Sequence, residues 1–242
     1  MIFQDALAAL NPVHKVGDQI GEAISVHEKV STDERRERVV NLLDVVGIPD
    51  PSRRADQYPH EYSGGMRQRA MIAMSIANEP DVLIADEPTT ALDVTIQAQV
   101  LEVLERIQDR TQSSIMLITH DLGVVAGVAD RVYVMYAGSQ VEQSDVESIF
   151  YEPRHPYTQG LLRSLPRIDA RSRERLDRIV GQPPSLVAVP PGCAFHPRCP
   201  HARVPGRCSE ERPVLRPVDG PAHVAACHFA EEIAAQVEED GS

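Results

Sequence analysis

Two carboxylates close a short apolar run in the segment 82–88, VLIADEP. At the carboxyl end of a buried strand, Asp86 can bind Mg²⁺ through water, and Glu87 can orient or deprotonate a water molecule that attacks a γ-phosphate. The next apolar run, 114–120, contains His120 at its end. Because ligands of α/β sheets bind outside the carboxyl ends of the strands, we expect His120 and Glu87 at one sheet edge. A lone acidic pair or a lone histidine is more often structural, so the prediction depends on their order in the chain.

Ser63, Gly64 and Gly65 precede a segment, 66–77, that is rich in helix-favouring alanine, methionine, glutamine and arginine. Each glycine costs about 1 kcal/mol relative to alanine inside a helix. One hypothesis is that Ser63 caps the helix and that the glycines let an anion approach its N-terminus, where unpaired N–H groups attract negative charge. The alternative is an ordinary capped helix with a flexible entry.

The elements that position these residues follow an α/β pattern. The segments 81–86 and 114–120 are short apolar runs typical of buried parallel strands, and 94–111 has the periodicity of an amphipathic helix between them. A further strand is predicted at 130–138. After about residue 150 the composition changes, since thirteen of the 19 prolines lie there. We therefore expect a layered α/β domain followed by a loop-rich extension.

The composition excludes some classes of protein. The 242 residues carry a formal net charge of −12, which argues against a protein that binds nucleic-acid phosphates. No apolar run approaches the roughly 18 residues that a membrane-spanning helix needs, and the N-terminal residues lack the pattern of a signal peptide. A cytosolic protein without disulfides is the expectation.

All four cysteines lie close together, with the spacing C-x5-C-x8-C-x18-C. Four thiolates in a proline-rich segment could ligate a metal or a cluster and fold around it. The spacing lacks the close pairs typical of zinc ribbons and bacterial ferredoxins, and the alternative is unliganded thiols. Nearby histidines are possible substitute ligands. The candidate ligands are Cys193, Cys199, Cys208 and Cys227, with His196, His201 and His228 beside them.

Together these motifs resemble the ATP-binding subunit of an ABC transporter. YSGGMRQR is similar to the family signature, VLIADEP to the Walker B strand, ALD (91–93) to the D-loop, ITHD to the switch histidine and FQDALAALNP (3–12) to the Q-loop. FQD…LNP, HEYSGGMRQR and EPRHPYTQGLLRSLP (152–166) resemble the oligopeptide and dipeptide importers more narrowly. The resemblance implies a P-loop NTPase-like ABC nucleotide-binding domain, with an incomplete sheet, over 1–150 (helical subdomain at about 12–75). It also implies an oligopeptide-transporter extension with the four-cysteine site over 151–242.

The resemblance also implies roles for residues. Gln4 would contact Mg²⁺ and the attacking water, Asp86 would bind the metal's water shell, and Glu87 would be the general base. His120 would contact the γ-phosphate, and Asp93 would lie at the contact between two ATPase subunits. The γ-phosphate of ATP held by the opposite subunit would touch Ser63, Gly64 and Gly65. Tails of this branch are similar to those that hold a [4Fe–4S] cluster, which we favour over Zn²⁺.

The implied function is energy coupling in an importer of oligopeptides or dipeptides, by ATP hydrolysis at a dimer interface. The implied partners are a second ATPase subunit, two transmembrane permease subunits and, indirectly, an extracytoplasmic solute-binding protein, but no nucleic acid. The expected location is the cytoplasmic face of the cell membrane. Alternatives are a non-catalytic short subunit that pairs with a complete ATPase, an importer subunit for nickel or another solute, and a chromosome- or repair-type ABC ATPase.

The phosphate-cradling loop G-x-x-x-x-G-K-[ST] does not occur in the sequence, because none of the 14 glycines is followed by lysine. In the resembled family this Walker A loop precedes the Q-loop. We therefore expect an N-terminally truncated chain that alone neither binds ATP in its own site nor hydrolyses it. A truncated reading frame or a start assigned too late is one explanation, and a natural short form is the other.

Overall fold

The computed structural model describes residues 1–5, 9–90, 92–165 and 178–234. Ala91 of the predicted D-loop and parts of two other motifs, at 6–8 and 166, lie outside the described residues. The chain divides into two compact units, Met1–His120 and Asp121–Ser242, and each is described by itself. The predicted boundary at residue 150 comes from the family resemblance, whereas the two compact units meet at residue 120. The boundary at residue 150 stays a prediction.

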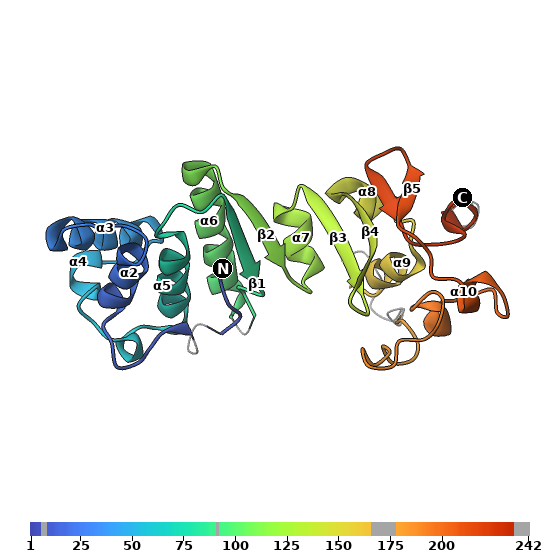
Figure 1. Ribbon diagram of the computed structural model, residues 1–242, viewed down its shortest axis with the longest axis horizontal. Coiled ribbons are helices and arrows are strands. Elements are labelled where there is room, and N and C mark those ends of the chain that lie inside the picture. Colours follow the sequence, from blue (N-terminus) through green and yellow to red (C-terminus); the bar gives the residue numbers. More distant parts are fainter. Residues whose placement is uncertain (6–8, 91, 166–177, 235–242) are drawn as a thin grey trace. The chain divides into compact units, whose positions relative to one another are not determined.

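The first unit begins with a group of helices (Figure 1). Ser31 starts α3 by accepting a hydrogen bond from the Glu34 amide at 3.2 Å, and the chain leaves the helix through Gly47, whose φ is +71°. Apolar side chains of α2, α3 and α5, such as Ile20, Leu43 and Met71, share one core. The elements are α2 (Val16–Ser25), α3 (Thr32–Val45), α4 (Pro51–Arg54), η1 (Pro59–Glu61) and α5 (Gly64–Ile76).

A two-stranded parallel sheet completes the first unit. Strand β1 (Val82–Asp86) pairs in register with β2 (Ser114–Ile118), so that Asp86 lies opposite Ile118, and α6 (Val94–Thr111) connects the two strands. The buried residues Leu83 and Ala85 of β1 belong to the same core as the apolar side of α6. The predicted parallel pairing and the helix between the strands are confirmed. The predicted burial is wrong for β2, since Met116 and Ile118 are 55% and 45% exposed.

The second unit contains an antiparallel sheet in the order β3-β4-β6-β5. The strand predicted at 130–138 therefore does not continue the parallel sheet of the first unit. It turns back through Ala137 and Gly138, both at positive φ, and pairs with β4. The elements are α7 (Leu122–Val128), β3 (Arg131–Tyr136), β4 (Ser139–Asp145), α8 (Val146–Tyr151), α9 (Pro156–Arg163), η2 (His196–Arg198), α10 (Arg207–Glu210), β5 (Arg216–Asp219) and β6 (His223–Ala225).

A buried carboxylate connects three parts of this second unit. Glu142 of β4 is 0% exposed. Its Oε1 accepts hydrogen bonds from the Arg154 amide at 2.6 Å and pairs with His223 Nε2 of β6 at 2.8 Å, and its Oε2 accepts from the His155 amide at 3.0 Å. The carboxylate thus holds the chain at the start of α9 against the sheet.

Three aromatic rings of the second unit pack against one another. The ring centroid of Tyr157 lies 4.6 Å from that of Tyr136 and 5.4 Å from that of Phe195. His155 caps α9 by accepting a hydrogen bond from the Tyr157 amide at 3.1 Å. The His-Pro-Tyr segment 155–157 is therefore a structural junction between α9, the sheet and the loop that carries Phe195. Among the described helices of both units, none is long and apolar enough to cross a membrane.

Candidate functional site

Three residues predicted to act together meet at the edge of the parallel sheet. Gln4 Nε2 donates a hydrogen bond to Glu87 Oε2 at 2.8 Å, and His120 Nδ1 lies 3.1 Å from Glu87 Oε1. Glu87 directly follows β1, and His120 follows β2 two residues after its end. Ile2 places Gln4 at the same edge, because its backbone bridges to β1 beside Ala85.

The surroundings of Glu87 keep its carboxyl ionised. Hydrogen bonds from Thr90 and then from His120 are the largest causes that lower the pKa of Glu87 from its ordinary value. The side chain of Glu87 is 27% exposed and that of His120 is 75% exposed, so water reaches both. An ionised carboxylate open to water can accept a proton from it. Thr90 is a contact that the motif comparison alone did not predict.

Asp86 ends β1, where its side chain is half-buried. A single hard oxygen ligand of this kind fits Mg²⁺, which usually binds proteins through one or two carboxylates and keeps several waters. Within the described part of the chain, no group of three histidine, cysteine, aspartate or glutamate side chains is placed to hold a metal ion by itself. A magnesium ion at Asp86 would accordingly need water and phosphate oxygens as its other ligands.

The signature residues and Asp93 form the beginnings of two helices. Ser63 Oγ accepts a hydrogen bond from the Met66 amide at 3.3 Å and caps α5, and Asp93 Oδ1 accepts from the Ile96 amide at 2.9 Å and caps α6. The hypothesis that Ser63 caps the helix agrees with this geometry.

The two glycines of α5 differ from each other. A Cβ atom on Gly65 would lie 2.9 Å from Ile96 Cγ2, so Gly65 lets the start of α6 approach α5. A Cβ atom on Gly64 would have no neighbour within 4 Å. Only Gly64 therefore faces open space, where a ligand could approach the helix N-terminus.

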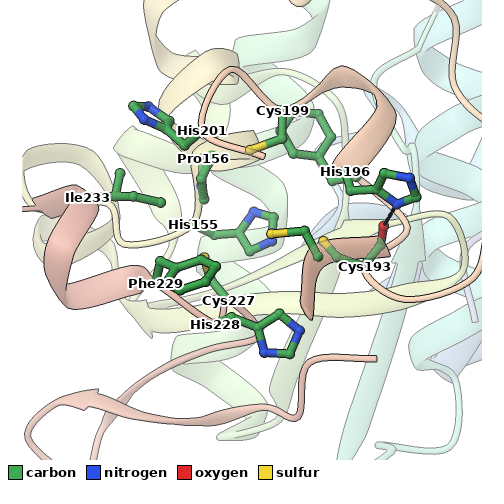
Figure 2. A pocket seen from close by; sticks show the side chains of 12 residues that line it. His155, Pro156, Cys193, His196, Cys199, His201, Cys227, His228, Phe229 and Ile233 are labelled. Atoms are coloured by element: carbon green, nitrogen blue, oxygen red, sulfur yellow. Dashed lines mark hydrogen bonds between the residues drawn. The ribbon is translucent and has the colours of Figure 1, made fainter. Parts of the chain in front are cut away.

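All four cysteines line one small cavity in the second unit, of about 20 Å³ (Figure 2). Cys208 is buried and the other three are half-buried, and none forms a disulfide. Burial raises the pKa of Cys199 to about 12 and that of Cys227 to about 11, so these thiols are protonated. Metal binding would have to release those protons. In their described positions, the four cysteines do not complete a metal-ligand set.

The histidines named with the cysteines line the same cavity, as does His155. Figure 2 shows the one hydrogen bond drawn among these side chains, between His196 Nδ1 and the Cys193 carbonyl oxygen at 2.9 Å. Backbone contacts also hold the cysteine segments together. The Cys193 amide donates to the Cys208 carbonyl at 2.9 Å, and a Cβ atom on Gly192 would lie only 2.5 Å from that carbonyl oxygen.

Comparisons with known proteins identify the family. The sequence profile described as "ABC transporter" matches residues 1–90, and that described as "Oligopeptide/dipeptide transporter, C-terminal region" matches 141–208. The dipeptide transport ATP-binding protein DppD of Bacillus subtilis is 59% identical over 204 residues, which cover 84% of this chain and 61% of that protein. DppD of Escherichia coli is 52% identical over 230 residues, which cover 95% of this chain and 69% of that protein.

A solved structure extends the comparison to the fold. The dimeric post-hydrolysis ATP-binding cassette MJ0796, bound to ADP and Pi, matches with a TM-score of 0.52 and 25% identity, over 60% of this chain and 61% of that one. The predicted fold class is confirmed. The chain spans about three fifths of the length of the Bacillus relative. The chain belongs to the family of ATP-binding proteins of oligopeptide and dipeptide ABC transporters.

Proposed function

We propose that this chain acts as an energy-coupling, ATP-binding subunit of an importer of oligopeptides or dipeptides. The observation that carries the proposal is the hydrogen-bonded group of Gln4, Glu87 and His120 at one edge of the parallel sheet. It combines a carboxylate that can accept a proton, an amide that can orient water, and an imidazole beside them. The names of the relatives support the peptide branch of the family.

Each residue of the site has a proposed step. Glu87, kept ionised by its neighbours, accepts the proton of the water that attacks the γ-phosphate. Gln4 orients that water. Since the Glu87 carboxylate accepts from His120 Nδ1, the imidazole needs a second proton on Nε2 to donate to a phosphate oxygen as well. Asp86 would bind the water shell of Mg²⁺, which neutralises developing phosphate charge when bound.

The residues at the starts of α5 and α6 have a proposed partner in trans. Ser63 and Gly64 offer a capped helix N-terminus to the phosphates of ATP held by a second ATP-binding subunit, with Gly65 allowing the two helices to pack. Asp93 caps the neighbouring helix at the same contact. The dimeric state of the matched cassette supports pairing. ATP then favours the closed pair because its contacts are complete only there.

The remaining partners and the location follow from the family. Two permease subunits would bear on the first unit, in the segment between Gln4 and α5, and a solute-binding protein would act through them. The chain would lie on the cytoplasmic face of the membrane. Its net charge of −12 argues against a nucleic-acid partner. The solute is selected by the other components, so nickel or another small solute is the alternative to peptide.

The test is ATP hydrolysis by this chain mixed with a complete ATP-binding subunit of the same family whose own general-base glutamate is replaced by glutamine. Replacing Glu87 by glutamine removes the general base, and we expect hydrolysis by the mixed pair to fall at least about 100-fold. Glu105→Gln makes the same chemical change at an exposed position of α6 and leaves the rate unchanged. If Glu87→Gln leaves the rate of ATP hydrolysis by the mixed pair unchanged, the chain is instead a non-catalytic short subunit.

A separate proposal concerns the four cysteines: we propose that they bind a metal centre, with a [4Fe–4S] cluster favoured over Zn²⁺. Their convergence on one cavity supports this, and the incomplete ligand set described above argues against it. The proposal therefore requires the loops to close around the metal, and no step of ATP hydrolysis involves it. Anaerobic purification followed by iron, sulfide and zinc analysis tests it. Zinc in a colourless protein refutes the cluster, and a metal-free protein refutes both.

A further inference from the structure

Thr90 contacts Glu87 twice within the turn that follows β1. Its Oγ1 donates a hydrogen bond to Glu87 Oε2 at 2.7 Å, and its amide donates to the Glu87 carbonyl oxygen at 3.1 Å. The same residue thus holds both the side chain and the backbone of the proposed base. We infer that Thr90 is a positioning residue, whose hydroxyl fixes the orientation in which the Glu87 carboxylate meets the attacking water. This inference rests on the proposed role of Glu87 as the base.

The other two partners of Glu87 are less suited to fixing it. Gln4 is exposed and belongs to a segment far away in the sequence, and the side chain of His120 is 75% exposed. Thr90 is half-buried, and its branched Cβ restricts the side chain to few rotamers. Of the three hydrogen bonds to the Glu87 carboxylate, only the one from Thr90 joins two residues of the same turn. It therefore does not depend on the positions of the two more distant segments.

The backbone of Glu87 gives a reason for this support. Its φ is +45°, a left-handed conformation that residues other than glycine rarely adopt. The amide of Thr90 closes the turn that holds this conformation, and the amide of Glu87 itself donates to the Ile118 carbonyl of β2 at 2.9 Å. The backbone is thereby fixed at both ends, and the hydroxyl of Thr90 extends that order to the carboxylate.

The pattern of hydrogen bonds also selects the reactive oxygen. Oε2 of Glu87 accepts from both Thr90 and Gln4, whereas Oε1 contacts His120. A carboxylate has about four lone-pair positions, two on each oxygen. The two donors occupy the capacity of Oε2, so Oε1 is the oxygen with room for a water proton. Thr90 therefore directs the proton to Oε1, beside His120.

The first test measures the order of the Glu87 side chain without ATP. In the full chain at one fixed pH, ¹³C relaxation of the Glu87 side chain is compared among the wild type, Thr90→Val and Thr90→Ser. Valine keeps the shape of threonine without its hydroxyl, so we expect the side chain to become mobile, whereas serine keeps the bond and the order. Thr89→Val makes the same change at the neighbouring buried threonine and leaves Glu87 ordered. An equally ordered Glu87 in Thr90→Val overturns the inference.

The second test uses the same mixed pair. We expect Thr90→Val to lower kcat about tenfold or more with little change in KM, because a misplaced base affects the chemical step rather than binding. Thr90→Ser restores most of the rate, and Thr89→Val has no effect. Unchanged kcat in Thr90→Val overturns the inference. Absence of hydrolysis by the mixed pair that contains the wild-type chain would refute the proposed function, and the relaxation experiment would then still decide whether Thr90 positions Glu87.

Discussion

Replacing Glu142 by glutamine tests how strongly one buried carboxylate holds the second unit together. The carboxylate accepts from three donors: the amides of Arg154 and His155, and the ring of His223. Glutamine has the same shape but only one accepting oxygen. If that oxygen takes the place of Oε1, the new amide group faces the His155 N–H, and two donors oppose each other in a site with no access to water.

The size of the effect follows from these contacts. A hydrogen bond to a charged group contributes about 1.5–3 kcal/mol, and the opposed donor loses one such bond. We therefore expect Glu142→Gln to reduce the free energy of unfolding of the second unit by about 2 kcal/mol. Since about 1.4 kcal/mol corresponds to a factor of ten, hydrogen-exchange protection falls about 30-fold. Glu142→Leu leaves all three donors without an acceptor and costs about 3–5 kcal/mol.

The assay is hydrogen exchange of the backbone amides at 154 and 155, because the chain has two compact units and a single unfolding transition is not assured. Glu147→Gln is the matched control, since Glu147 is exposed on the neighbouring helix α8. The reasoning is refuted if protection in Glu142→Gln changes no more than in Glu147→Gln.

Three further predictions concern the helix caps and the histidine of the second unit. Gly65→Ala forces a Cβ atom against Ile96, and we expect thermal melts to show a loss of about 1–3 kcal/mol of stability. Gly64→Ala places its Cβ atom in open space and stabilises the helix by up to about 1 kcal/mol. Equal effects of the two substitutions would contradict the packing argument. Ser63→Ala removes the cap of α5 and costs about 1 kcal/mol, seen as faster hydrogen exchange at the helix start, while Ser63→Asp keeps it. Burial lowers the pKa of His155 to about 4 from 6.5, so the unfolded chain binds the proton more readily. The contribution of His155 to the stability of the second unit is then complete above about pH 6.5, and about 3 kcal/mol is lost towards pH 4. The measurement is the free energy of unfolding as a function of pH. If His155→Asn leaves the slope of this dependence unchanged, the prediction is wrong.

Local patterns predicted the first unit well. The amphipathic segment 94–111 coincides with α6, and the apolar runs on either side of it form the parallel pair β1 and β2. Both depend on periodicity and apolar content within a few residues. The partner of β3 could not be predicted in this way. Strand β4 reads SQVEQSD, and its buried positions include Glu142 and Ser144. Donors distant in the sequence, such as His223, make the burial of Glu142 possible.

The site shows the same division. Gln4, Glu87 and His120 come together because each lies just beyond a strand or bridge residue at one sheet edge, which their order in the chain indicated. The contact of Thr90 with Glu87 depends on the left-handed backbone conformation of Glu87. This conformation is difficult to predict from the sequence, because glycine, the residue that usually adopts it, is absent from the turn. The packing role of Gly65 could not be predicted from the sequence either. The atom that excludes a side chain at this position belongs to Ile96, which lies 31 residues away in the chain.

The close approach at Gly192 has a consequence for the thiol cavity. Since main-chain atoms of the two segments that carry Cys193 and Cys208 touch directly, any side chain at position 192 would force them apart. A hydrogen bond between peptide groups therefore joins these two segments without any help from the thiols. Removal of a bound centre by a chelator would then leave Cys193 and Cys208 beside each other, while the loops that carry Cys199 and Cys227 open again.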